Sequence, residues 1–304
     1  MKKLILLLAL PLGLVAQDSF QVKVTGHGQP MILIPGLSSA GEVWDTTVAH
    51  YQDRFECHVL TLAGFAGVPR VPGPMLDRVR DSLAAYIREK KLAKPVIVGH
   101  SLGGFVALAL GSKYPGLAGK LVIVDSYPFM AAVADPKTTP EQAKASAAQM
   151  KQYMGSQTQD MYERFTKSGM ATRMMVTKDS DFERIVAWGL ASDRTAVTDS
   201  MSELFAADLR EDIANIKIPT LVLGSWIGYK QFTDREKTEA NLKLQYAKDP
   251  LVFFRAGRKH TVNLKWVEKV DPGVAGNLIV TLRSGQSVEM SRRQSTRLRE
   301  VMSY

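Results

Sequence analysis

The stretch Val96–Gly104 constrains this chain more than any other, because an apolar, β-branched run there leads into a Gly-His-Ser-Leu-Gly turn. A small-residue, helix-prone segment follows the turn directly. A strand, a Gly-x-Ser-x-Gly turn and a helix in this order predict a nucleophile elbow with Ser101 at its apex. The apex backbone of such a turn is strained, so the neighbouring positions Gly99 and Gly103 must be small. We expect the Ser101 hydroxyl to stand clear of the sheet, beside a helix N-terminus that stabilises negative charge.

Strand-like and helix-like segments alternate through most of residues 18–248. Residues 31–34 form a continuous apolar run of the kind found in buried parallel strands, and residues 75–91 carry apolar side chains at helical spacing. Further apolar runs lie at 120–124 and 218–224. This alternation predicts an α/β fold with a doubly wound, mostly parallel sheet.

The strand pattern stops between about Pro128 and Ile216, where the sequence is helical in character. Eight of the thirteen methionines fall in this stretch. Methionine provides adaptable apolar surface, so the segment is predicted to be a helical lid over a hydrophobic pocket. The alternative is that these methionines fill the core of a helical insertion.

A serine hydroxyl becomes a nucleophile only when a base accepts its proton and a third group orients that base. In elbow hydrolases the order along the chain is serine, acid, histidine. His260 is the only histidine downstream of the elbow, so it is the candidate base. Asp125, which ends the strand after the elbow, is the preferred acid, and Asp234 and Glu236 are the alternatives.

The backbone N–H groups of two leucines are candidates for an oxyanion hole. Leu37 follows a buried strand in the glycine-bearing loop Pro35–Ser39, and Leu102 comes directly after the nucleophile. Amides at these two places donate to the charge that develops during acyl transfer. Ser101, His260, Asp125, Leu37 and Leu102 thus make up the predicted catalytic site.

The first 17 residues have the pattern of a secretory signal peptide, with two lysines, an apolar stretch from Leu4 to Leu10 and small residues before Gln17. A periplasmic or secreted protein is therefore expected, with no stable membrane span after the signal is removed. Cys57 is the single cysteine, so an internal disulfide is excluded. The sequence offers no cluster of metal ligands and no phosphate-binding loop, and no cofactor is expected.

The motifs of residues 20–248 resemble those of the α/β-hydrolase fold family. The resemblance rests on four segments of this sequence: Ile32–Leu37, Val96–Gly104, Lys120–Ser126 and Pro219–Gly224. It implies hydrolysis of a small, mostly apolar ester, thioester, lactone or amide through an acyl-enzyme, without a cofactor. A serine at the elbow is unlike the dehalogenase and epoxide-hydrolase branches, which use a carboxylate there.

Residues 249–304 depart from that pattern and carry ten of the basic residues against five acidic ones, within a net charge of +9 for the whole chain. Two strand-like runs at 278–282 and 287–290 flank an Arg-Ser-Gly-Gln turn, which predicts a hairpin. A basic helix is expected from Ser291 to Met302.

This β-rich, basic segment resembles the second half of a LytTR DNA-binding domain. The resemblance rests on residues 253–255, 258–264, 282–285 and 291–293. It implies that Arg258 and Arg292 reach the major groove and that nearby basic residues such as Lys259 hold phosphates. A DNA-binding regulator with an inactive hydrolase half is thus the alternative to an exported hydrolase. In the hydrolase reading, residues 250–260 complete the central sheet and supply His260, and the partner is a small-molecule substrate.

Overall fold

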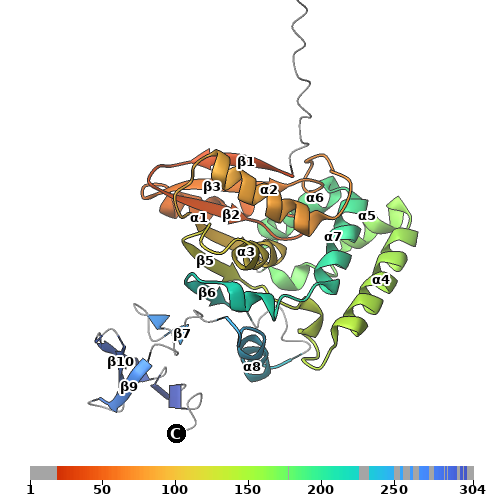
Figure 1. Ribbon diagram of the computed structural model, residues 1–304. Coiled ribbons are helices and arrows are strands. Elements are labelled where there is room, and N and C mark those ends of the chain that lie inside the picture. Colours follow the sequence, from red (N-terminus) through yellow and green to blue (C-terminus); the bar gives the residue numbers. More distant parts are fainter. Residues whose placement is uncertain are drawn as a thin grey trace, which may run out of the picture.

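The computed structural model describes residues 19–176, 178–225 and 233–249, together with 254–255, 261–262, 267–273, 277–283, 285, 287–292, 295–296 and 298–299. A six-stranded sheet with the order β1-β3-β2-β4-β5-β6 forms its centre (Figure 1). β1 runs antiparallel to β3, and the remaining neighbours are parallel. The strands are Phe20–Thr25 (β1), Gln29–Ile34 (β2), Phe55–Leu62 (β3), Val96–His100 (β4), Lys120–Val124 (β5) and Thr220–Leu223 (β6). The predicted α/β fold with a mostly parallel sheet is confirmed. The predicted signal peptide lies outside the described residues.

Helices cover both faces of the sheet, and the alternation of side chains along β2 shows why. Ile32 and Ile34 are buried in the cluster that contains the apolar residues of α2 and α3, whereas Met31 and Leu33 are buried in a second cluster under η1 and α1. Successive residues of a strand point to opposite faces, so a continuous apolar run is buried on both. These helices are Gly41–Trp44 (η1), Asp45–Tyr51 (α1), Met75–Glu89 (α2) and Leu102–Lys113 (α3).

The predicted helical insertion lies between β5 and β6. It comprises Met130–Ala132 (η2), Pro140–Ser156 (α4), Gln159–Ser168 (α5), Arg173–Met175 (η3), Asp179–Ala191 (α6), Arg194–Ala206 (α7) and Asp212–Asn215 (η4). α7 contacts both α4 and α2, so it joins the insertion to the sheet layer (Figure 1). Among the described helices, none is both long and apolar enough to cross a bilayer.

The exposure of the methionines in the insertion tests whether they fill its core. Met161, Met170 and Met175 are 51%, 74% and 68% exposed. The core-filling interpretation is wrong for these three residues, because their side chains lie at the surface of α5, of η3 and of the turn between them. They therefore provide adaptable apolar surface rather than packing.

The C-terminal part of the chain forms separate small sheets, after α8 (Arg235–Gln245) has followed β6. Phe254–Arg255 (β7) pairs antiparallel with Thr261–Val262 (β8). The expectation that residues 250–260 extend the central sheet is wrong for the described residues, in which that sheet ends at β6. Pairing β7 with a strand six residues away closes a much shorter loop than pairing it with β6, and short loops cost less entropy.

The predicted hairpin of the C-terminal segment is present. Leu278–Leu282 (β10) pairs with Ser287–Glu289 (β11) on one side and with Val267–Pro272 (β9) on the other, all antiparallel. This sheet has its own buried cluster, which contains Leu278, Val280, Val288, Met290 and Leu298. Residues 292, 295–296 and 298–299 are helical, within the range predicted for the basic helix.

Candidate active site

Ser101 occupies the sharp turn between β4 and α3, where its backbone has φ 52° and ψ −117°. Its N–H donates to the carbonyl of Val124 at 2.9 Å, and its carbonyl accepts from the N–H of Phe105 at 3.0 Å. The residue therefore belongs to the sheet ladder on one side and to the first turn of the helix on the other. A positive φ is strained for a serine and is typical of a nucleophile elbow.

The glycines around Ser101 allow the strand and the helix to approach each other. A Cβ on Gly99 would lie 2.2 Å from the carbonyl oxygen of Gly103, and a Cβ on Gly103 would lie 2.4 Å from that of Ile34. A Cβ on Gly104 would meet the Cβ of Ser126 at 2.6 Å. The expected requirement for small residues two before and two after the apex is confirmed.

Asp125 follows β5, at the strand end next to the elbow. Its backbone also has a positive φ, of 47°, and its N–H donates to the carbonyl of Leu223 at 2.8 Å. Burial raises the pKa of its carboxyl group, and a hydrogen bond from the backbone of Ser225 opposes the rise. Its Oδ1 is buried and has no hydrogen-bond partner among the described residues. Such a buried acceptor requires a donor.

The alternative acids, Asp234 and Glu236, lie at the N-terminus of α8. Asp234 caps α8: its side chain accepts from the N–H of Lys237 at 2.8 Å, and it pairs with the Lys237 ammonium at 3.1 Å. These contacts with Lys237 lower the pKa of Asp234. Glu236, in the same turn, is exposed. Asp125 is therefore the carboxylate whose backbone is joined to the strand ends beside the nucleophile.

The loop after β2 packs directly on the elbow. A Cβ on Gly36 would lie 3.0 Å from Nδ1 of His100 and 3.4 Å from the Cβ of Ser101, so the absence of a side chain there leaves room for the imidazole. Burial lowers the pKa of His100, which favours its neutral form. The next residue, Leu37, has an N–H that donates to no acceptor within the described part of the chain. Leu102 is buried at the first position of α3, where helical N–H groups lack intrahelical partners.

A catalytic triad needs a histidine whose ring is free to accept the serine proton. His58 is buried, with Nδ1 2.8 Å from the Tyr86 hydroxyl and Nε2 2.7 Å from Glu56, which accounts for both ring nitrogens. His260 lies outside the described residues, as do Arg258 and Lys259. Arg292 is described and exposed in the C-terminal segment.

One contributor to the site gives no signal in the sequence. The Tyr246 hydroxyl, buried just after α8, donates to the carbonyl of Ser126 at 2.9 Å. Burial raises the pKa of this phenol, so it stays a donor. The contact holds the chain immediately after Asp125, and it joins residues 120 positions apart, which no local pattern indicates.

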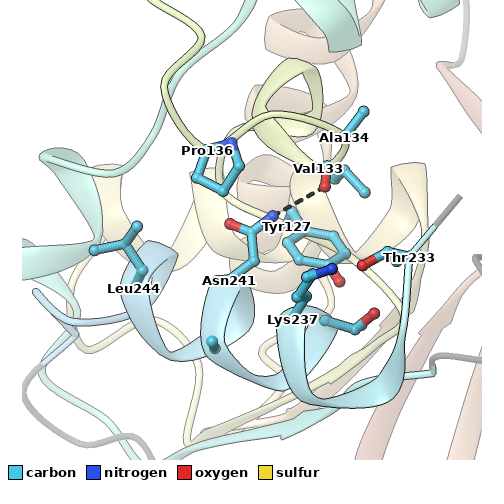
Figure 2. Close-up of a pocket in the computed structure, with 10 residues that line it drawn as sticks. Tyr127, Val133, Ala134, Pro136, Thr233, Lys237, Asn241 and Leu244 are labelled. Atoms are coloured by element: carbon cyan, nitrogen blue, oxygen red, sulfur yellow. Dashed lines mark hydrogen bonds between the residues drawn. The ribbon is translucent and has the colours of Figure 1, made fainter.

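A pocket of about 270 Å³ lies between α8 and the chain that follows β5 (Figure 2). The lining includes Tyr127, Val133, Lys237 and Leu244, and the amide of Asn241 donates to the carbonyl of Val133 at 3.0 Å. The lining is mostly apolar. It contains neither Ser101 nor Asp125, so we assign this pocket no part in bond cleavage.

Comparison with known proteins places this geometry in a family. The model of the alpha/beta hydrolase family matches residues 31–270. The chain belongs to this family. The match continues past residue 248, the expected end of the hydrolase domain, and it includes the position of His260.

Esterases of several organisms are similar to the chain. It is 26% identical over 237 residues to a pimeloyl-[acyl-carrier protein] methyl ester esterase of Proteus mirabilis, covering 76% of this chain and 85% of that protein. The match to the Vibrio cholerae enzyme of the same name is 31% identical over 110 residues, 36% of this chain, and spans less than half of the relative, 42% of its length. An esterase structure from Thermogutta terrifontis shares the fold with a TM-score of 0.61 and 21% identity, covering 77% of this chain and 82% of that one.

Proposed function

We propose that the protein is a serine hydrolase that cleaves a small, mostly apolar ester, lactone or amide through an acyl-enzyme. The observation that carries the proposal is the position of Ser101. It sits at the apex of a strained elbow, at the strand end next to that of Asp125, a partly buried residue whose buried Oδ1 has no hydrogen-bond partner among the described residues. Strained backbone at adjacent strand ends and a partly buried acid with a raised pKa are typical of catalytic sites.

In the proposed reaction Ser101 Oγ attacks the carbonyl carbon while His260 accepts the hydroxyl proton. The carbonyl π-electrons move to oxygen, and the N–H groups of Leu37 and Leu102 stabilise the oxyanion. The intermediate collapses when the bond to the leaving group breaks, and His260 gives its proton to the departing oxygen or nitrogen. Water then attacks the acyl-enzyme by the same route and regenerates the Ser101 hydroxyl.

Asp125 is proposed to orient His260 and to stabilise it in the protonated form. Its Oδ1 supplies the acceptor that an imidazole N–H needs, and a carboxylate in that position stabilises the imidazolium that forms during attack. The raised pKa of Asp125 arises from burial, and a nearby imidazolium opposes that effect.

The ester as substrate class is supported by relatives, several of which are methyl ester esterases by name. Exposed methionines on the insertion suit an apolar acyl or alcohol group, because thioether side chains adapt to different shapes. We further propose that residues 1–17 export the protein to the periplasm or medium, which cell fractionation with a C-terminal tag tests.

Labelling with a fluorophosphonate probe tests the proposed function. The wild-type protein is expected to be labelled, and Ser101→Ala to be unlabelled. Ser112→Ala is the matched control, because Ser112 is a buried serine of the same helix whose hydroxyl donates to the Leu108 carbonyl. Folded wild-type protein that takes up no probe would overturn the proposal.

The alternative proposal is duplex DNA binding through residues 249–304. It is favoured by the separate three-stranded sheet with its own apolar cluster and by the exposed Arg283 and Arg292. Binding through Lys and Arg releases counterions, so the affinity should fall steeply with salt. A gel shift of a mixed-sequence duplex at 50 and 200 mM salt tests it, and the absence of any shift at low salt excludes it.

A further inference from the structure

Four residues with strained backbone follow the carboxyl ends of four neighbouring strands. Ser38 (φ 56°) comes after β2, Ala66 (φ 47°) after β3, Ser101 (φ 52°) after β4 and Asp125 (φ 47°) after β5. A positive φ in a residue other than glycine persists only where its surroundings hold it. The sheet ladder holds the last two. Ser38 and Ala66 lie in loops beyond the ladder and need another support.

One hydroxyl group of the insertion contacts both loops. Ser192 lies between α6 and α7 and is 7% exposed. The Ser38 hydroxyl donates to Ser192 Oγ at 2.9 Å, and the N–H of Ala66 donates to the same oxygen at 2.9 Å. The Ser192 hydroxyl in turn donates to the carbonyl of Trp188 at 2.8 Å. A hydroxyl group has one donor and two acceptor sites, and this one uses all three.

The backbone on either side of Ser192 is fixed without its hydroxyl. The N–H of Gly67 donates to the carbonyl of Ala191 at 3.0 Å, and the N–H of Asp193 donates to the carbonyl of Gly64 at 2.8 Å. Deleting the hydroxyl therefore removes the links to Ser38 and Ala66 while the connection between α6 and α7 stays attached to the β3 loop.

A second side chain of the insertion lies at the same point. Burial raises the pKa of Tyr162, and hydrogen bonding with Thr166 and Ser38 partly opposes that rise. The Tyr162 hydroxyl also donates to the carbonyl of Gly189 at 3.2 Å. The hydrogen bond that holds Ser38 in place is the one to Ser192, at the end of α6.

Ser38 is the residue directly after Leu37, and the N–H of Ser39 closes a turn around both by donating to the carbonyl of Gly36 at 3.3 Å. We propose that Ser192 is a positioning residue that fixes the Leu37 N–H in the oxyanion hole by holding Ser38, an inference that rests on the proposed serine hydrolase function. The helical insertion thereby contributes to transition-state stabilisation.

Steady-state hydrolysis of p-nitrophenyl butyrate by the full chain tests this role. Ser192→Ala is expected to lower kcat about tenfold, less than the roughly 10²–10³ of losing an oxyanion donor outright. KM is expected to stay the same, because the oxyanion contact strengthens only in the transition state. Ser38→Ala should cause a similar loss. The double variant should lose no more kcat than either single variant, because both substitutions break the same Ser38–Ser192 hydrogen bond.

The control is Ser200→Ala, which removes another buried hydroxyl of the insertion, one that contacts Met75 Sδ at 2.7 Å. Its kcat is expected to match the wild type. A second readout needs no substrate: hydrogen exchange of the Ser39 amide should be faster in Ser192→Ala and unchanged in Ser200→Ala. Faster exchange together with the lower kcat supports the proposal.

Either of two kinetic results overturns the inference and leaves the proposed function standing: kcat of Ser192→Ala equal to that of Ser200→Ala, or losses in Ser38→Ala and Ser192→Ala that multiply in the double variant. Absence of both hydrolysis and fluorophosphonate labelling in the wild type overturns the proposed function, and the positioning role with it. Unchanged exchange at Ser39 in Ser192→Ala shows that the hydroxyl does not hold the loop.

Discussion

The N–H of Ser101 donates to the carbonyl of Val124 at 2.9 Å, one residue beyond the paired ends of β4 and β5. This bond extends the sheet ladder into the elbow, so the nucleophile and Asp125 stand at neighbouring strand ends. The backbone arrangement depends on strands β4 to β6, and the Tyr246 hydroxyl supports it by donating to the Ser126 carbonyl.

Asp125→Asn should lower activity and raise stability at neutral pH. The asparagine cannot stabilise an imidazolium, and we expect kcat to fall about 10⁴-fold by comparison with other triads. A carboxyl group whose pKa is raised in the folded state favours folding most below its unfolded pKa, and this contribution is lost as pH rises through the folded pKa. The variant should therefore gain stability relative to the wild type as pH rises from 3 to 7, and the two should converge at the acid end.

Urea unfolding at several pH values, together with kcat at pH 7, measures both effects. A loss of stability in Asp125→Asn at pH 7 would show that the carboxylate is held by favourable contacts rather than by burial alone. Unchanged kcat would move the role of acid to Asp234 or Glu236, the alternatives considered from the sequence.

His260→Ala should lower kcat at least about 10³-fold, because no other group is proposed to take the Ser101 proton. His27→Ala is the matched control, since His27 is an exposed histidine in the turn between β1 and β2. The pH dependence of kcat/KM should show an essential base, and this limb should disappear in the variant. Equal activity in the two variants would exclude His260 as the base.

The sequence predicted those parts of the site that depend on local pattern. An apolar run followed by Gly-x-Ser-x-Gly defines the elbow, because strand, turn and helix propensities act over a few residues, and Asp125 was found because it ends the next apolar run. The hydrogen bond between Ala66 and Ser192 and the one between Tyr246 and Ser126 were not predicted. They join residues 126 and 120 positions apart, and the sequence around a buried serine or tyrosine does not indicate its hydrogen-bond partner.

The pairing of β7 shows that a strand can be predicted from its sequence while its partner is not. An apolar strand after α8 has the composition of a further strand of the central sheet, and composition alone favours that place. Within the described residues β7 pairs with β8 instead. Which partner a strand takes depends on loop closure and on competing edges as well as on its own residues.

Asp81→Asn should destabilise the protein by about 1 kcal/mol at neutral pH, a modest amount because the side chain is 43% exposed. Asp81, on α2, accepts hydrogen bonds from Arg80 and, across to α3, from Lys113 and Tyr114. The bond from Arg80 is the largest cause of its lowered pKa. A lowered carboxyl pKa stabilises the fold above the unfolded value, and this stabilisation is lost as pH falls through the folded value.

The difference between wild type and Asp81→Asn in urea unfolding should therefore shrink as pH falls below about 4. Activity is not expected to change, because Lys113 and Tyr114, the partners of Asp81, lie at the opposite end of α3 from Ser101. A difference that stays constant down to pH 2 would contradict the ionic origin of the effect.

Gly99→Ala tests whether the elbow requires close approach of strand and helix. The added Cβ would lie 2.2 Å from the carbonyl oxygen of Gly103, which is backbone and cannot rotate away. We expect a loss of about 3 kcal/mol or more in the free energy of unfolding, with loss of hydrolysis in the fraction that still folds. Gly155→Ala, in α4 where nothing lies within 4 Å of the new Cβ, should instead gain about 0.5–1 kcal/mol, because glycine destabilises a helix relative to alanine. Similar unfolding free energies for the two variants would mean that the elbow relaxes around a side chain, and the tight β4–α3 contact would then not be what holds Ser101 in its strained conformation.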